Sequence, residues 1–179
     1  MFGSKNATSA DNQQERLKKE INPWYISGFS DGEGTFHVAF TKRPDLSQRW
    51  AIIPEFHINQ DRGRSAVLYE IQRFFGCGQI RENHHSRAND QTLVYVVRKR
   101  EDLLRIIIPF FEQCPLRSQK QLDFIVFAKI VRAMREGAHL THDGFRALVK
   151  EAFTMNYGGR YRKHAIETIL CSESSETTR

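Results

Sequence analysis

The sequence has few of the residues that build thiolate metal sites or disulfide frameworks, and none of the segments that span membranes. Its three cysteines, Cys77, Cys114 and Cys171, are odd in number, far apart and without a C-x-x-C pair, which argues against both kinds of site. No apolar run approaches the roughly 20 residues that cross a bilayer, and the polar N-terminus lacks the apolar stretch of a signal peptide. We therefore expect no membrane partner and an intracellular, reducing compartment: a bacterial cytoplasm or nucleoid, or an organelle such as a chloroplast or mitochondrion.

The length and the composition predict one folded domain with an anionic partner. The chain has 179 residues, of which 40% are hydrophobic, enough for one sizeable core and too few for two. Its 27 Lys and Arg against 21 Asp and Glu give a net charge of +6, which suits a polyanion. We expect a single domain over residues 21–171, between flexible tails at 1–20 and 172–179.

Hydrophobic periodicity predicts an α+β fold. A helix over residues 24–31 is set by Asn22 as its N-cap and Pro23 at its first position, with glycines ending it. Strict alternation then predicts strands, the second of them irregular at Pro54. The remaining ranges are strands at 35–41, 50–59, 79–84 and 92–98, and helices at 65–75, 102–113, 118–135, 144–156 and 162–170. Strands joined as hairpins give an antiparallel sheet with one apolar face beneath helices and one polar face.

The segment with the sequence WYISGFSDGEG, residues 24–34, carries the chemistry. Gly28 and Gly32 are four residues apart, so with Ser27 they form a strip of small side chains that lets a second helix approach closely. Glu33 follows at the end of the helix, where unpaired carbonyls and the negative end of the dipole favour a cation. Two such helices side by side would bring two carboxylates together as a divalent-metal site of oxygen ligands.

The stretch YISGFSDGEG followed by Thr35 and Phe36 resembles the LAGLIDADG motif of homing endonucleases. The resemblance continues in FHINQ at residues 56–60 with Arg64, and in PLRSQKQ at 115–121, which is similar to the PLxxxK segment of that family. It covers about residues 22–135 and indicates the single-motif, homodimeric type.

The resemblance implies an αββαββα saddle whose antiparallel sheet faces DNA, with additional C-terminal helices. It implies that Glu33 and the Gly32 carbonyl bind Mg²⁺ (or Mn²⁺, with Ca²⁺ as a non-cleaving substitute), and that Gln60, Arg64 and Lys120 line the cleavage pocket. A gapless alignment to some members places Ser118 at the lysine position instead, although we favour Lys120. The motif helices would form the dimer interface, through Trp24, Ser27, Gly28, Asp31 and Gly32. Independently of the resemblance, we expect Asp31 to form hydrogen bonds near the helix end rather than to bind metal.

The outward positions of the strands are the predicted DNA-reading surface, because a two-stranded ribbon fits the major groove. Arg81 is the candidate for a guanine contact. The complete set is His37, Ala39, Thr41, Arg43, Arg49, His57, Gln79, Arg81, Asn83 and Arg98. The hairpin tip at His84 and His85 is either a solvated turn or a DNA contact, and the basic stretch at residues 158–163 is a candidate contact to backbone phosphates.

We interpret the chain as an intron-encoded type of homing endonuclease that cleaves both strands of a long pseudo-palindromic duplex and has no small-molecule substrate. One alternative is a non-cleaving DNA- or RNA-binding relative, such as an intron maturase or a transcription regulator, but Glu33 favours cleavage. A ribosome-associated RNA-binding protein would explain the basic charge but not the glycine–acid–glycine helix end.

Overall fold

The computed structural model describes residues 20–83, 91–158 and 162–171. Both predicted tails, the hairpin tip at His84 and His85 and residues 159–161 of the basic stretch lie outside this part. Within it, the element order confirms the α+β prediction, with two successive helix–hairpin units followed by further helices.

The motif forms helix α2 (Pro23–Glu33), which begins as the sequence predicts. The Asn22 side chain accepts a hydrogen bond from the Trp24 N–H at 2.8 Å. The helix extends two residues further at its C-terminal end than predicted, because Gly32 continues it and the chain turns away only at Gly34. A β-carbon on Gly34 would lie 2.6 Å from the carbonyl oxygen of Ser30, so this turn requires glycine.

Four strands form one antiparallel sheet in the order β1-β2-β4-β3. Their bounds are β1 (Gly34–Lys42), β2 (Trp50–Asp61), β3 (Gln79–Glu82) and β4 (Thr92–Val97). The prediction of an irregularity at Pro54 is wrong, because the register between β1 and β2 runs unbroken through the pair Val38–Pro54.

Proline is accommodated there because its nitrogen is not needed as a donor. The Val38 carbonyl points to the free edge of β1, where it accepts a hydrogen bond from Arg162. Val38 and Pro54 are therefore a pair that exchanges no hydrogen bonds with each other. On its other side Pro54 lies beyond the last pair between β2 and β4, which is Phe56 with Val97.

The helices after the first hairpin are interrupted more often than the sequence predicts. The range 144–156 is not one helix, since Asn156 and Tyr157 take left-handed φ values of 51° and 59°. The last helix starts at Ile166, four residues later than predicted. The bounds are η1 (Arg62–Arg64), α3 (Ala66–Phe75), α4 (Arg100–Asp102), the π-helical η2 (Leu103–Ile107), α5 (Ile108–Gln113), α6 (Lys120–Arg135), η3 (Ala138–Leu140), α7 (His142–Ala152), α8 (Met155–Gly158) and α9 (Ile166–Cys171).

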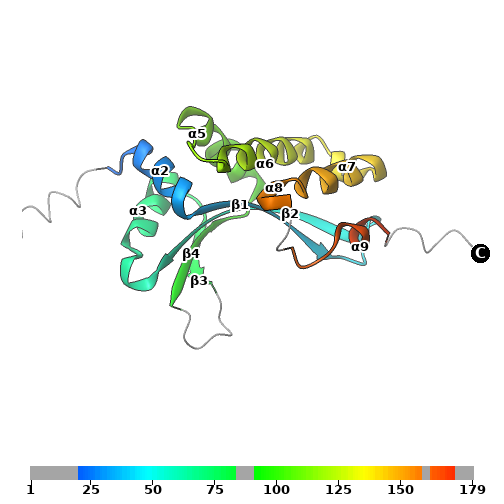
Figure 1. The fold of residues 1–179 in the computed structure, drawn as a ribbon, viewed down its shortest axis with the longest axis horizontal. Coiled ribbons are helices and arrows are strands. Elements are labelled where there is room, and N and C mark those ends of the chain that lie inside the picture. Colours follow the sequence, from blue (N-terminus) through cyan, green and yellow to red (C-terminus); the bar gives the residue numbers. More distant parts are fainter. Residues whose placement is uncertain (1–19, 84–90, 159–161, 172–179) are drawn as a thin grey trace, which may run out of the picture.

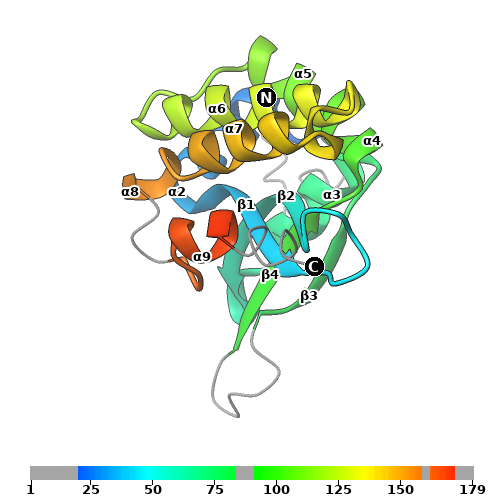
Figure 2. The ribbon, with the colours of Figure 1, turned by 90° about the vertical axis from the view of Figure 1, so that its right-hand side faces the viewer.

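The molecule has two layers, with the helices on one face of an arched sheet (Figure 1). Helix α6 packs against β1 and β2, and Figure 2 shows α6 and α7 side by side over the sheet. The fully buried Phe36 ring contacts Phe56, Phe111, Phe124 and Phe127, with centroid distances of 5.1–5.3 Å. The predicted core assignment of the α6 phenylalanines is confirmed.

The free edge of β1 is covered by side chains from the C-terminal segment. The Asn156 amide donates to the Phe36 carbonyl at 3.0 Å, and the Arg162 guanidinium donates to the carbonyls of Val38 and Ala152. These contacts protect the edge strand from pairing with another strand. Among the described residues, no helix combines the length and apolar character needed to cross a bilayer.

Candidate active site and nucleic-acid interface

The carbonyl end of α2 is bound by a lysine that is remote in sequence. The Lys120 Nζ donates to the carbonyl oxygens of Ser30 at 3.0 Å, Asp31 at 2.8 Å and Gly32 at 3.3 Å. The last carbonyls of a helix have no intrahelical N–H partner, and the helix dipole makes this end negative. Lys120 therefore supplies both the missing donors and a compensating charge.

A carboxylate of α2 in turn accepts hydrogen bonds from the residues just before α6. Asp31 accepts hydrogen bonds from the backbone N–H groups of Arg117 at 2.9 Å and Ser118 at 3.0 Å, and from the Ser118 hydroxyl at 2.5 Å. We call these contacts, together with those of Lys120, the α2–α6 clamp. Of the two alternatives left open by the sequence, Lys120 reaches the Gly32 carbonyl, whereas Ser118 is engaged by Asp31.

The clamp alters the proton affinity of both charged groups. Burial holds the pKa of Lys120 below its usual value, although the carboxylates of Asp31, Glu33 and Asp123 act in the opposite direction. Burial tends to raise the pKa of Asp31, but the hydrogen bonds from Ser118 and Arg117, with the charge of Lys120, outweigh it and lower the pKa. Asp31 is therefore a stable anion, and its hydrogen-bond partners belong to its own chain.

Glu33 and Gly32 are exposed beside the clamp. The pairing of Gly34 with Ile58 brings the end of β2 alongside the end of α2, so Gln60 lies on the strand next to this carboxylate. Arg64 is exposed in η1, directly after β2. The elements therefore bring the predicted catalytic residues to one end of the sheet.

The donors at this end suit a hard cation, but one chain supplies few of them. A carboxylate and a backbone carbonyl are oxygen ligands of the type that Mg²⁺ prefers. Within residues 20–83, 91–158 and 162–171, no group of three His, Cys, Asp or Glu side chains is placed to hold a metal ion.

One side of α2 is open in the way that close helix packing requires. A β-carbon added to Gly28 or Gly32 would have no atom within 4 Å, and Trp24 at the start of the helix is 54% exposed. Ser27, which we had placed on this strip, is instead only 3% exposed and donates to the Cys114 carbonyl at 2.9 Å. Its position falls on the inner side of the helix, and its hydroxyl, like the Asp31 carboxylate, is bound within the chain.

The predicted reading residues of the sheet share the face turned away from the core. On β1 these are His37, Ala39 and Thr41, which alternate with the buried Phe36 and Val38. Strand pairing aligns His57 with Val96 and Gln79, and Asn59 with Val94 and Arg81. Asn83, just past β3, is exposed.

Three predicted arginines have contacts that the sequence does not reveal. Arg43 is ion-paired with Asp45 at 2.6 Å, which raises the Arg43 pKa. Arg49 has a positive φ of 58° and donates to the Pro44 carbonyl at 3.1 Å. Arg98 is ion-paired with Glu55.

Glu55 is the residue of this face that we did not predict. Its carboxylate also binds the His57 Nε2 at 2.7 Å. Burial tends to raise the Glu55 pKa, but His57 and Arg98 outweigh this and lower it. An acid at an outward strand position, two residues before His57, was the signal in the sequence.

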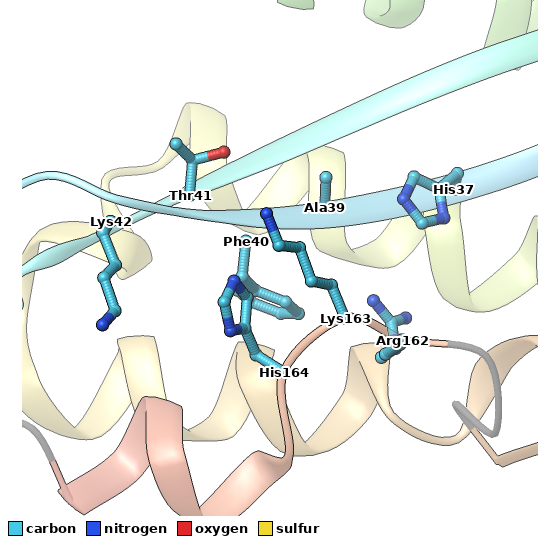
Figure 3. A pocket seen from close by; sticks show the side chains of 8 residues that line it. All are labelled: His37, Ala39, Phe40, Thr41, Lys42, Arg162, Lys163 and His164. Carbon is cyan, nitrogen blue, oxygen red and sulfur yellow. The ribbon is translucent and has the colours of Figure 1, made fainter. Parts of the chain in front are cut away.

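The C-terminal segment adds a pocket beside β1 that the sequence did not indicate (Figure 3). The pocket has a volume of about 640 Å³, and Arg162, Lys163 and His164 line it together with five residues of β1: His37, Ala39, Phe40, Thr41 and Lys42. Arg162 packs over the rings of Phe40 and Phe153. Burial, then the positive charges of Arg162 and His57, lower the His37 pKa, against the effect of Glu55.

The chain is similar to known proteins that share this arrangement of helices and strands. The family model for LAGLIDADG endonucleases matches residues 26–131. The chain belongs to the LAGLIDADG endonuclease family. The resemblance seen in the sequence and the fold that it implies are confirmed.

Relatives and solved structures agree with this family assignment. A probable intron-encoded endonuclease 2 from Neurospora crassa is 34% identical over 140 residues, which are 77% of this chain and 30% of that protein. The crystal structure of the homing endonuclease I-TnaI is 34% identical, with a TM-score of 0.77 over 87% of this chain and 99% of that one. The structure of I-SmaMI bound to an uncleaved DNA target in the presence of calcium ions is 28% identical, with a TM-score of 0.75 over 84% of this chain and 49% of that one. The chain thus spans less than a third of the Neurospora protein and about half of I-SmaMI.

Proposed function

We propose that this chain is a homing endonuclease that cleaves both strands of a long, pseudo-palindromic DNA duplex with the help of Mg²⁺. The observation that carries the proposal is the exposed Glu33 carboxylate at the carbonyl end of α2, with Lys120 bound beside it. Non-cleaving members of such a scaffold have no need for this acid. An intron-encoded origin fits the name of the Neurospora relative, a probable intron-encoded endonuclease.

Two copies of the chain would make the complete enzyme. Each contributes one Glu33, and cleavage of two strands requires two carboxylates. The chain matches about half of I-SmaMI, as expected if one I-SmaMI chain contains two such units. The open strip of Trp24, Gly28 and Gly32 would then pack against the same strip of the second copy, so that both Glu33 side chains meet on the two-fold axis.

The residues present fit a divalent cation held by Glu33 and the Gly32 carbonyl of each copy. When bound, Mg²⁺ would activate a water and stabilise charge on the phosphate; Mn²⁺ could replace it, and Ca²⁺, present in the I-SmaMI structure, would bind without supporting cleavage. Three neighbouring side chains would also contribute to cleavage. Lys120, whose ammonium donates to the last carbonyls of α2, can place a positive charge near the phosphate, while Gln60 can orient water and Arg64 can stabilise negative charge.

The polar face of the sheet would lie along the major groove of the duplex, with no membrane and no small-molecule substrate involved. The two-fold symmetry of the dimer requires two related half-sites. The cysteines of the described part are free, as they would be in a reducing compartment of the cell or organelle that holds the DNA.

The test is selection of cleaved sites from a duplex library randomised over the whole target, with Mg²⁺ and, as the control, with EDTA. We expect a pseudo-palindromic consensus that is recovered only when Mg²⁺ is present. Binding without cleavage under every divalent ion would contradict the nuclease and favour the maturase alternative. Recovery of an asymmetric site would contradict the homodimer.

A further inference from the structure

Glu55 is a buried acid in the centre of a face that we propose to lie on DNA. Its side chain is only 6% exposed, whereas that of its partner Arg98 is 56% exposed. One carboxylate oxygen accepts from the Arg98 Nε and the other contacts the His57 Nε2 at 2.7 Å. With both oxygens occupied and little exposed surface, Glu55 itself is poorly placed to accept a hydrogen bond from a base.

The sheet register places Glu55 in a row of basic groups. It lies opposite His37 on β1, and the pairing of Phe56 with Val97 puts Arg98 next to it on the other side. The rings of His37 and His57 have centroids 6.2 Å apart. Arg162 approaches from the C-terminal segment, close enough to lower the His37 pKa. Glu55 is therefore the carboxylate that holds together basic side chains of two neighbouring segments, His57 on β2 and Arg98 just after β4.

The contact with Arg98 leaves its reading edge available. An arginine recognises guanine with two parallel N–H groups that face O6 and N7 in the major groove. The Arg98 bond to Glu55 uses the Nε, and among residues 20–83, 91–158 and 162–171 the two terminal nitrogens have no hydrogen-bond partner. A long side chain held at Nε also loses less conformational entropy on binding.

We propose that Glu55 is a specificity-determining positioning residue, which holds Arg98 so that the terminal nitrogens of its guanidinium read one guanine in each half-site. The assignment rests on the proposed DNA-binding function and adds to it a residue that does not touch DNA. The same carboxylate orients His57 on the neighbouring outward position.

This role has an unusual signature, because Glu55 is an anion facing a polyanion. Removing it should release Arg98 and reduce discrimination at one base pair. It should also remove repulsion toward phosphates, so affinity for unrelated DNA should hold or rise. A residue that merely supported the fold would lower both quantities together.

The experiment selects bound sequences from a randomised duplex library, in metal-free buffer, with five proteins: wild type, Arg98→Ala, Glu55→Ala, Glu55→Gln and the double variant Glu55→Ala with Arg98→Ala. Dissociation constants for the selected target and for an unrelated duplex accompany the selection. We expect Arg98→Ala and Glu55→Ala to lose about tenfold preference for guanine at the same symmetric position. Glu55→Gln, which keeps the shape and can still accept from Arg98, should retain part of that preference. The double variant should lose no more at this position than Arg98→Ala alone.

Three outcomes would overturn the assignment while leaving the proposed function intact. Glu55→Ala could change the preference at a position that Arg98→Ala does not affect. It could also weaken binding equally on every duplex, or leave the selected sequence unchanged. If the wild-type protein selects no sequence and binds no duplex, the proposed function itself is wrong and the assignment falls with it. Thermal unfolding of Arg98→Ala, whose side chain is largely exposed, verifies that the reading position is defined by a folded protein.

Discussion

Replacement of Gly28 by leucine should strengthen the fold of one chain and prevent two chains from pairing. Gly28 lies inside α2, and a β-carbon there would have no atom within 4 Å. A glycine in a helix interior costs about 1 kcal/mol relative to good helix formers such as leucine. The variant should therefore gain about 0.5–1 kcal/mol of stability as a monomer. In a chain of this length that gain corresponds to about 1–4 °C in the unfolding midpoint.

The effect on the dimer has the opposite sign. In the proposed dimer, Gly28 faces Gly28 or Gly32 of the second copy, where small residues permit a short distance between helix axes. A leucine on each side would overfill this contact, at a cost of about 3 kcal/mol. Because each 1.4 kcal/mol is a factor of ten, the dissociation constant should rise about a hundredfold.

Sedimentation equilibrium measures the dissociation constant, and thermal unfolding at a dilution where the wild type is monomeric measures the fold. Gly28→Ala is the matched control, since it makes the same helical gain with a much smaller side chain. A leucine variant with an unchanged dimer would refute the interface. A monomer less stable than the wild type would show that Gly28 is packed inside its own chain.

Three further perturbations test the site and the sheet. Glu33→Gln keeps the size of the side chain but removes the charge that holds the metal, so cleavage in Mg²⁺ should fall to background while metal-free DNA binding and dimerisation hold or improve; near-normal cleavage would exclude Glu33 as the ligand. Arg81→Ala should relax preference at one symmetric position by about 1–3 kcal/mol in a binding selection, whereas an equal loss on all sequences would make it a phosphate contact. Asp31→Asn removes a carboxylate whose pKa is lowered in the folded state, so the stability it contributes is present above the unfolded pKa and lost as the pH falls through the folded pKa. The variant should be about 1 kcal/mol less stable than the wild type at neutral pH, with a difference that vanishes in acid denaturation; a constant difference would exclude the charge as its cause.

The sequence was sufficient wherever a local pattern decides the structure. Alternation around Phe36 and Val38 correctly predicts which side of β1 is buried, because side chains of a strand alternate between its faces. The cap at Asn22 predicts the start of α2. The glycine–acid–glycine sequence predicts the end of α2, where Glu33 lies. These features depend only on neighbours within a few residues.

Long-range contacts account for what the sequence did not predict. Pro54 is tolerated because β4 has ended at that level of the sheet, which cannot be inferred from the residues around the proline. Ser27 faces Cys114, 87 residues away, and so leaves the exposed strip. Glu55 was not predicted, because its contact with Arg98 depends on the pairing of β2 with β4.

The charges at the C-terminal end of α2 connect the fold to the proposed metal site. This end collects helix carbonyls and two carboxylates, all of them negative. The α2–α6 clamp satisfies most of them within the chain: Lys120 covers the carbonyls from Ser30 to Gly32, and the start of α6 takes the Asp31 carboxylate. Glu33 is exposed at this end, where its charge acts on Lys120, and within the described residues it forms no ion pair. A second chain packed against α2 would add another Glu33 and increase the repulsion, which a divalent cation bound near the two carboxylates would reduce.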